Sequence, residues 1–383
     1  MANSTNPPST SSSPNTKSQN SSWLGLLLII FLPIFISFLL YQLNEFDSAP
    51  IPDSAFSWAT VAVPKHYNHV FDVTERIGDG LLSGPEDFTY DSESGVIYTS
   101  CSDGWIKRVT LKEPVSVDNW TYVGGRPLGL AFGPDKDLIV AEADKGLLKV
   151  TKDGMVKLLT DKAEGLEFRL TDGVDVAQNG VIYFTDASYK YNFAQHMLDF
   201  LEGRPYGRFM SYDPSTKKTQ VLVRDLYFAN GVALSPEQDF VVFCESVMRR
   251  CRKYYIEGKK KGMVDSFVDS LPGYPDNIRY DGEGKYWIGL ATARTTFWHL
   301  LLRYPSMRKS IAIMSKFVKL PHMQRDAGVI AVNLNGEVVA LYSDPSLAKI
   351  TGGIKIDDHL YIGSLAASYI GRVNLTHLVS KAA

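Results

Sequence analysis

A loose sixfold repeat of strand starts constrains the fold of this 383-residue chain more than any other sequence feature. Six times after residue 80, a pair of small or polar residues precedes an alternating apolar strand. Most starts are followed by a turn signal and a second strand, such as Val-Ile-Tyr-Thr at 96–99. We call the first residues of the six pairs the slot residues; they are Glu86, Leu128, Asp172, Asn230, Asp276 and Gly352.

The spacing of the slot residues indicates the architecture. Three of the five intervals match the roughly 40–50-residue period of four-stranded propeller blades. Six such units close into a ring, which removes exposed sheet edges. The sequence therefore predicts an all-β fold, a six-bladed β-propeller over residues 80–383, with residues 42–79 as the linker that leads into it. A β-sandwich with coincidental spacing is the alternative.

The two longer intervals between slot residues must carry insertions, which we place at residues 190–208 and 292–327. If the first strand of a blade leaves one channel mouth, the second returns to it, and both insertions follow a second strand. We therefore expect helical insertions over one channel mouth. The second insertion is apolar and basic, which favours a lid over a pocket that also touches a membrane. The alternative is a helix packed on the propeller flank.

The N-terminal part of the chain differs in composition from the repeat. Residues 1–22 are mostly Ser, Asn, Thr and Pro, which predicts a disordered tail. Residues 23–41 are uncharged and apolar, and at about 1.5 Å per residue they come close to spanning a bilayer core of about 30 Å. We predict one N-terminal transmembrane helix that is retained as a signal anchor. A cleaved signal peptide and a buried core helix are the alternatives.

The charges around the apolar segment indicate an orientation. Lys17 precedes it and Glu45 and Asp47 follow it, so the positive-inside rule places residues 1–22 in the cytosol. The propeller would then face the lumen or the outside of a single-pass protein of the endomembrane system, in the endoplasmic reticulum, vacuole or plasma membrane. The sequons at Asn119 and Asn374 lie on that side, where we expect glycosylation.

Charge and cysteine content exclude several classes of protein. The formal net charge of -2 gives no indication of a nucleic-acid partner. Three cysteines are too few for a disulfide scaffold. Cys244 and Cys251 flank a short turn between two strand-like runs, so they either form a disulfide across a hairpin or are buried free thiols. We favour free thiols, because cysteine is among the most buried residue types.

The slot residues predict a metal site. The first strand of each blade lines the central channel, so the six strand starts converge on one mouth. Crowded carboxylates repel one another unless they share a cation or a proton, although each polar slot residue alone is also compatible with a turn or cap. Oxygen ligands suit Ca²⁺, which takes about 6–8 of them. The predicted ligands are Glu86, Asp172, Asn230, Asp276 and its neighbour Asn277.

Several motifs carry a resemblance to a known family over roughly residues 50–378. They are Gly-Pro-Glu-Asp at 84–87, Arg-Pro-Leu-Gly-Leu at 126–130, Leu-Thr-Asp-Gly-Val-Asp-Val at 170–176, Tyr-Phe-Thr-Asp-Ala-Ser at 183–188 and Ala-Asn-Gly-Val-Ala at 229–233. With these motifs the chain resembles the strictosidine synthase-like family. Its anchored layout is similar to that of adipocyte plasma membrane-associated proteins, and its wider relatives include paraoxonases and gluconolactonase-type propellers.

The resemblance carries two different implications for activity. Strictosidine synthase condenses tryptamine with secologanin, and its catalytic glutamate falls in the sixth slot, where this chain has Gly352. Paraoxonases hold a catalytic calcium with residues of the first, third, fourth and fifth slots, which correspond to the five predicted ligands. Their second-slot histidine corresponds to Leu128.

We therefore expect a calcium-dependent hydrolase of small ester or lactone substrates, with Glu86 and Asp172 as candidate bases. The chain has no Gly-x-Ser-x-Gly motif, so a serine-hydrolase triad is not supported. One alternative is a condensing lyase of the strictosidine synthase type, which the absence of a carboxylate at Gly352 disfavours. The other is a non-catalytic binding propeller, which Leu128 favours.

Overall fold

The computed structural model of the protein describes residues 1, 20–57, 59–318 and 325–382. It divides the chain into two units, Met1–Phe46 and the larger Asp47–Ala383. In the first unit, α1 (Asn20–Leu43) is described with side chains from residue 29 onward, and most of its apolar side chains there are exposed. Within the described ranges, no helix is both long and apolar enough to cross a membrane. Most of the expected tail at 1–22, and the side chains of 23–28, lie outside the described residues.

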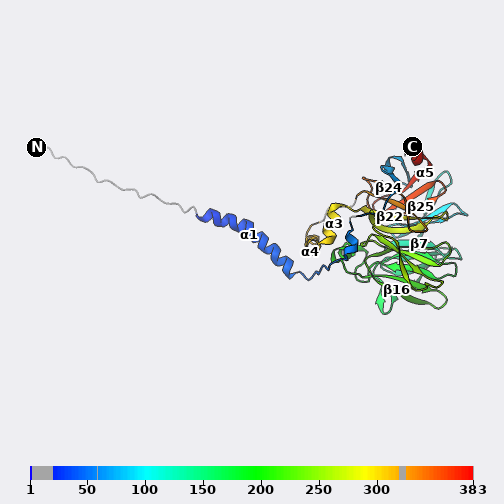
Figure 1. The fold of residues 1–383 in the computed structure, drawn as a ribbon, viewed down its shortest axis with the longest axis horizontal. Helices are drawn as coiled ribbons and strands as arrows, with labels where there is room; N and C mark the ends of the chain where they lie inside the picture. The colour runs from blue at the N-terminus through cyan, green and yellow to red at the C-terminus, as the bar shows by residue number, and fades with distance from the viewer. Residues whose placement is uncertain (2–19, 58, 319–324, 383) are drawn as a thin grey trace. The chain divides into compact units, whose positions relative to one another are not determined.

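The second unit contains six sheets of four or five strands, which confirms the six-bladed propeller (Figure 1). Each of the six strand starts opens its own sheet. The first three blades consist of β3 (Phe88–Asp91), β4 (Val96–Ser100), β5 (Trp105–Thr110) and β6 (Ser116–Tyr122); β7 (Pro127–Phe132), β8 (Leu138–Glu142), β9 (Gly146–Val150) and β10 (Val156–Thr160); and β13 (Thr171–Val176), β14 (Ile182–Asp186), β15 (Gly207–Asp213) and β16 (Lys218–Leu226).

The remaining blades follow the same antiparallel pattern, and a short hairpin, β11 (Lys162–Ala163) with β12 (Leu166–Glu167), leads into the third blade. The fourth blade is β17 (Ala229–Leu234), β18 (Phe240–Glu245), β19 (Arg250–Tyr255) and β20 (Val264–Val268). The fifth is β21 (Gly273–Tyr280), β22 (Lys285–Ala293), β23 (Ala327–Asn333) and β24 (Val338–Asp344). The last begins with β25 (Ile350–Ile356), β26 (His359–Ser364) and β27 (Ile370–Asn374).

Strands from the expected linker close the ring. β2 (Thr74–Ile77) pairs antiparallel with β27 and forms the outer strand of the sixth blade. β1 (His66–Tyr67) pairs parallel with β24, and two 3-10 turns, η1 (Asp53–Phe56) and η2 (Val70–Val73), flank β1 along the chain. The last blade therefore combines strands from both ends of the propeller sequence, which leaves no gap between the first and last repeats.

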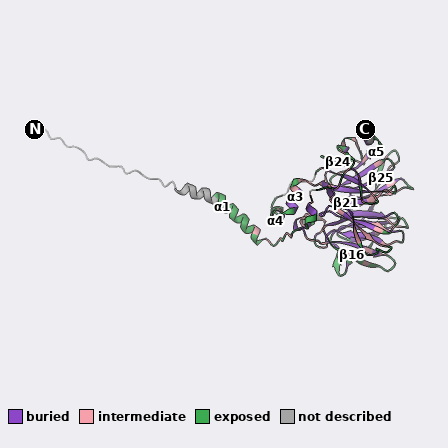
Figure 2. Cartoon of the chain, in the orientation of Figure 1, coloured by how far each residue is buried: buried purple, intermediate pink, exposed green. Residues whose placement is uncertain are grey.

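The cores lie between adjacent blades, because alternate residues of each strand face opposite sides of its sheet. One cluster joins Val242 of the fourth blade to Ile288 and Ile330 of the fifth. Another joins Phe88 and Ile97 of the first blade to the sixth. Figure 2 shows this as buried strands throughout the second unit. Each blade is thus stabilised by its two neighbours.

The two cysteines of the fourth blade form a disulfide. Cys244 on β18 and Cys251 on β19 are register partners in the antiparallel ladder and are covalently joined. Our expectation of free thiols is therefore wrong for this pair, because directly opposite residues of a hairpin bring their side chains together. Cys101 is a buried free thiol.

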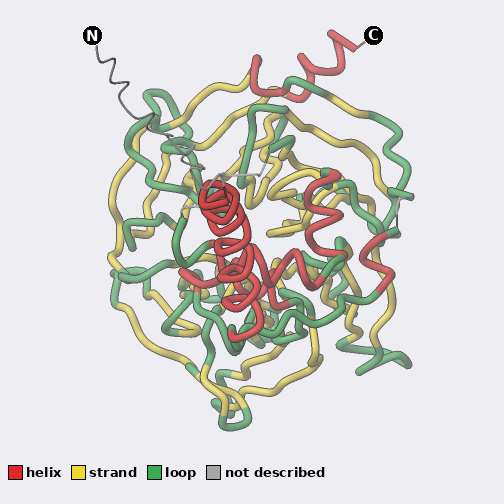
Figure 3. Tube along the Cα trace, turned by 90° about the vertical axis from the view of Figure 1, so that its left-hand side faces the viewer, coloured by secondary structure: helices red, strands yellow, loops and turns green. Residues whose placement is uncertain are grey.

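Both predicted insertions are helical. The first, between β14 and β15, contains η3 (Phe193–Gln195) and α2 (His196–Glu202). The second, between β22 and β23, contains α3 (Thr296–Arg303) and α4 (Pro305–Met314), and α5 (Leu375–Ala382) ends the described chain. Figure 3 shows these helices against the strands of the propeller. Thr295 caps α3 by accepting from the Trp298 amide, and Pro305 starts α4 at a position where no backbone donor is needed.

The helical insertions are held together by a buried arginine. The guanidinium of Arg308 on α4 donates to the carbonyl oxygens of Leu201 on α2 and of Ala49, which lies near the start of the second unit. Phe56 packs edge-on against His299 of α3. These contacts tie both insertions to residues 47–57 and form one cover, the lid, consisting of α2, α3 and α4.

The channel is closely packed where the inner strands meet. Further along these strands, Arg279 forms a buried ion pair with Asp87 and donates to the carbonyl oxygens of Leu130 and Val174.

Glycines bring neighbouring blades close together at the channel. Three slot residues are followed by a glycine, and a Cβ added to that glycine would clash with the carbonyl oxygen of the next blade's slot residue. The distances from the added Cβ to the oxygen are 2.4 Å for Gly129 and Asp172, 2.6 Å for Gly173 and Asn230, and 2.6 Å for Gly231 and Asp276.

We expect Gly231→Ala to lower the free energy of unfolding by about 1–3 kcal/mol, because the added methyl group forces the fourth and fifth blades apart. Gly133→Ala is the matched control, since its Cβ would meet Asp137 O at an ordinary 3.5 Å. Urea unfolding followed by tryptophan fluorescence measures both. Equal stability of the two variants would contradict the close packing at the channel.

Candidate metal centre

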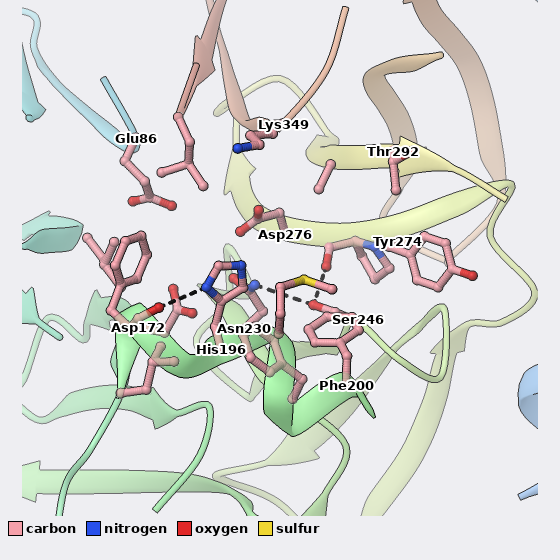
Figure 4. Close-up of a pocket in the computed structure, with 18 of the residues that line it drawn as sticks. Glu86, Asp172, His196, Phe200, Asn230, Ser246, Tyr274, Asp276, Thr292 and Lys349 are labelled. Carbon is pink, nitrogen blue, oxygen red and sulfur yellow. Dashed lines mark hydrogen bonds between the residues drawn. The ribbon is translucent and has the colours of Figure 1, made fainter. Parts of the chain in front are cut away.

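A cavity of about 280 Å³ opens at the channel mouth (Figure 4). Five of the six slot residues line it, so the repeat does bring distant strand starts together. The two insertions contribute Phe193, His196, Met197, Phe200 and Trp298. The two insertions therefore cover the same mouth that the slot residues face, as the order of strands predicted. The cavity has a polar end at the slots and a largely apolar wall at the lid.

Three carboxylates from different blades meet in this cavity. Glu86 precedes β3, Asp172 lies on β13 and Asp276 lies on β21. One oxygen of each lies within 4.8 Å of the others. Glu86 and Asp172 are only 2% and 4% exposed, and Asp276 is half-buried. This spacing is compatible with all three carboxylates contacting one ion.

Two amides accompany the carboxylates. Asn230 donates through Nδ2 to Ser246 Oγ at 3.3 Å, and Ser246 in turn donates to Pro275 O at 2.6 Å. Asn277 is buried outside the cavity wall and donates through Nδ2 to Glu86 Oε1 at 2.7 Å. Both amide nitrogens thus have protein partners, and only Asn230, whose side-chain oxygen has no partner among the described residues, lines the cavity.

Two buried oxygens at this site have no hydrogen-bond partner among the described residues. They are Glu86 Oε2 and Asn230 Oδ1. An unpaired buried acceptor costs about 1–3 kcal/mol, and more when it is charged. Acceptors of this kind, next to two further carboxylates, fit a bound cation, and all the donor atoms are oxygen, as Ca²⁺ prefers.

The proximity of the carboxylates changes their acidity. Burial, followed by the charges of Asp276 and Asp87, raises the pKa of Glu86 well above its usual range. The pKa of Asp172 is raised for the same reasons. Burial raises the pKa of Asp276 to about 8. Without a cation, the cluster therefore holds protons near neutral pH.

A buried arginine lies close to the cluster. Arg126 is buried, donates to Gly84 O at 3.0 Å and lies over the Phe193 ring at 5.6 Å. Its charge lowers the pKa of Glu86 and Asp172, although less than burial raises them. From the sequence, Arg126 was recognised only as part of the motif at 126–130. Its position two residues before Leu128 is the signal that could have placed it at the channel mouth.

The second and sixth slots carry no polar side chain, as the sequence indicates. Leu128 is buried in the cavity wall. At Gly352 an added Cβ would lie 3.4 Å from the Cβ of Asn277, and the hydroxyl of Thr351 beside it donates to Glu86 O at 2.6 Å. The sixth slot therefore carries no carboxylate, although the resemblance to strictosidine synthase implies a glutamate there.

The sequence repeat does not predict two further polar residues of the cavity, His196 and Lys349. His196 begins α2, and Lys349 precedes β25. Neither belongs to the repeat, so the register of slot residues cannot identify them. The prediction that residues 190–208 cover the mouth is the signal that could have singled out His196.

Similarity to known proteins defines the family. Residues 172–259 match the family model described as strictosidine synthase, and residues 67–109 match that described as strictosidine synthase-like, N-terminal. The protein STRICTOSIDINE SYNTHASE-LIKE 6 of Arabidopsis thaliana is 51% identical over 91% of this chain and 95% of its own length. Human adipocyte plasma membrane-associated protein is 33% identical over 81% of this chain and 80% of its own length. The chain belongs to the strictosidine synthase-like family.

Solved structures share the fold at much lower identity. A gluconolactonase from Xanthomonas campestris superposes with a TM-score of 0.56 at 14% identity, covering 86% of this chain and 98% of that one. Regucalcin from Agrobacterium tumefaciens, a calcium-binding protein, superposes with a TM-score of 0.57 at 14% identity, covering 81% and 95%. At this identity the similarity shows the propeller fold alone.

The raised carboxylate pKa values predict how metal binding depends on pH. Because burial raises the pKa of Asp276 to about 8, a cation must displace protons below that pH. We expect Ca²⁺ to raise the melting temperature more at about pH 8.5 than at about pH 6. In calcium-free protein the stability of the folded state changes with pH in the opposite direction. A carboxyl group whose pKa is raised by folding stabilises the folded state most below its unfolded pKa of about 3.9, and that stabilisation is lost as pH rises through about 8.

Differential scanning fluorimetry with Ca²⁺ or EGTA across this pH range measures both slopes. Asp276→Asn should abolish the calcium-dependent rise. Asp135→Asn, at an exposed turn, is the control and should retain it. A calcium effect that is the same at both pH values would contradict the assignment of the carboxylates as ligands.

Proposed function

We propose that this protein is a calcium-dependent hydrolase of small ester or lactone substrates. The observation that carries the proposal is the meeting of Glu86, Asp172 and Asp276 within 4.8 Å at the polar end of a covered cavity. The names of the distant structural neighbours, a gluconolactonase and a calcium-binding protein, support the same class.

Of the five predicted ligands, the four that line the cavity would hold the ion directly: Glu86, Asp172, Asn230 and Asp276. Their free atoms are oxygens, and two of them are buried acceptors without a partner in the described part of the chain. When bound, Ca²⁺ supplies a Lewis acid that polarises a carbonyl group and stabilises negative charge on its oxygen. Asn277 orients Glu86, and Ser246 orients Asn230, so the ligands are held before the ion binds.

The chain's other cavity residues would bind the rest of the substrate. Leu128, Phe200, Phe228 and Trp298 form apolar walls around the polar end. A substrate with an apolar body and one ester or lactone group fits this division. The lid also excludes bulk water from the reacting group, which strengthens electrostatic interactions inside the cavity.

Two other functions lead to different outcomes. A condensing lyase would convert tryptamine and secologanin to a product detectable by mass spectrometry, although the sixth slot holds Gly352 instead of a carboxylate. A non-catalytic binding propeller, favoured by the apolar Leu128 in the second slot, would lose thermal stability with Asp276→Ala and show no activity to lose.

We predict that the purified protein hydrolyses aryl esters or lactones and that EGTA removes this activity. Asp276→Asn should lower kcat/KM on the order of 100-fold or more, because a ligand of the carbonyl-polarising ion is lost. Asp135→Asn is the charge-matched control and should retain wild-type turnover. Hydrolysis of phenyl acetate and of a δ-lactone panel, with Ca²⁺ or EGTA, measures this. Equal turnover under both conditions, or none on the panel, contradicts the proposal.

We propose further that residues 23–41 anchor the protein in the endomembrane system, with the propeller in the lumen or outside the cell. The segment has no charged residue, and the described apolar residues of α1 are largely exposed. Exposed Met314, Phe317 and Val318, at and just after the end of α4, suit contact with a membrane. The name of the human relative, a plasma membrane-associated protein, supports this location.

The membrane proposal predicts that the expressed chain stays in the pellet after carbonate extraction and carries N-linked glycan. Asn119 is exposed on β6, whereas Asn374 is half-buried and accepts hydrogen bonds from Thr376 and His377. We therefore expect Asn119→Gln to remove most of the mobility shift that peptide N-glycosidase F produces. A carbonate-soluble chain without glycan would contradict both the anchor and the orientation.

A further inference from the structure

One histidine lies in the cavity without a role in holding the ion. His196 begins α2 and, within the described ranges, is the one histidine that lines the cavity. Figure 4 shows its imidazole among Asp172, Asn230 and Asp276. The lid therefore places an acid–base group beside the predicted metal centre, although the propeller slots themselves carry none.

The protein fixes both the orientation and the tautomer of this imidazole. His196 Nδ1 lies 2.8 Å from Phe193 O, and a carbonyl oxygen can only accept, so Nδ1 carries a proton. In the neutral ring, Nε2 then has a free electron pair, which points away from the Phe193 carbonyl oxygen. The Phe193 ring stacks on the imidazole at 5.6 Å. The 3-10 turn η3, which precedes His196, is capped by the Asn192 side chain, which accepts a hydrogen bond from the Gln195 amide.

The surroundings favour the neutral ring. Burial lowers the pKa of His196; the hydrogen bond to Phe193 O offsets part of this effect, and the positive charge of Lys349 lowers the pKa further. The charged groups that face this part of the cavity are Lys349, Arg126 and the three slot carboxylates, the last of which would share a doubly charged ion. At neutral pH His196 is therefore in the form that accepts a proton.

We propose that Nε2 of His196 is the general base that activates the attacking water, an inference that rests on the proposed hydrolase function. Nε2 takes a proton from water while the water oxygen forms a bond to the carbonyl carbon. The bond from that carbon to the ester or lactone oxygen then breaks, and the imidazolium returns its proton to the departing alkoxide. Ester and water are converted to acid and alcohol, and His196 ends neutral.

Other cavity residues are less suited to this role. Leu128 has no acid–base group, and a lysine ammonium such as Lys349 has no free electron pair. Glu86 and Asp172, the bases expected from the sequence, are at the same time ligands of the ion, and sharing their charge with it weakens them as bases. His196 combines a free electron pair with a position outside the ligand set.

The test uses the full-length protein with phenyl acetate and a δ-lactone as substrates. His196→Gln should lower kcat by about 10²–10⁴-fold, with KM changed little, because a proton-transfer group is lost and the apolar walls remain. At Ca²⁺ concentrations that saturate the site across the pH range, the acidic limb of the kcat/KM profile reports protonation of the base, and it should disappear. Lys349→Met should move that limb to higher pH, because a charge that disfavours the imidazolium is removed.

Readouts other than turnover show whether His196→Gln still folds and binds. The variant should keep the calcium-dependent rise in melting temperature and bind a phosphonate ester analogue with wild-type affinity in titration calorimetry. His359→Gln on β26, outside the cavity, is the matched control and should retain wild-type kinetics. If His196→Gln loses its fold, the direction of the Lys349→Met shift decides alone, and an unmoved acidic limb overturns the inference.

Two results separate this inference from the proposed function. Calcium-dependent turnover that His196→Gln leaves within about threefold of wild type overturns the role of His196 alone. A wild-type protein without turnover on the panel overturns the hydrolase and this inference with it.

Discussion

The close approach of the inner strands at the channel mouth determines both how the blades pack and how the slot carboxylates are spaced. Glycines after three slot residues permit this approach, because any side chain there would meet the carbonyl oxygen of the next blade. The same geometry forces three carboxylates to within 4.8 Å of one another. Their repulsion and burial are unfavourable unless protons or a cation are bound, so a feature of blade packing becomes a binding site.

The lid converts this site into a cavity. Helices α2, α3 and α4 come from two insertions far apart along the chain, and Arg308 ties α4 to α2 and to the first residues of the second unit. The propeller supplies the clustered carboxylates, and the insertions supply aromatic walls and His196. This division explains how a ring without a histidine in its second slot still has an acid–base group at its mouth.

The periodic part of the fold could be predicted from the sequence because each blade repeats the same local pattern. The repeat identified the slot residues, and the order of strands within a blade indicated which channel mouth the insertions cover. Strand β2 closes the ring from outside the repeat, so the pattern did not show which blade it joins. The disulfide of Cys244 and Cys251 depends on cross-strand register, which spacing alone leaves open.

The residues that sequence reasoning missed at the site share one property. Arg126, His196 and Lys349 lie in loops or an insertion, where no period fixes which side chain faces the cavity. Their contribution depends on three-dimensional surroundings, such as the carbonyl oxygen of Phe193 that sets the tautomer of His196. The repeat therefore identifies which strand starts meet at the channel mouth, but it does not identify the side chains that loops and insertions add around them.

Anomalous diffraction from crystals of the protein grown with Ca²⁺ would show directly whether an ion binds at the channel mouth. If the slot residues hold Ca²⁺, a single peak lies in the cavity, about 2.3–2.6 Å from oxygens of Glu86, Asp172, Asn230 and Asp276. No peak at saturating Ca²⁺, with the Arg126 guanidinium instead bonded directly to the carboxylates, would contradict this assignment.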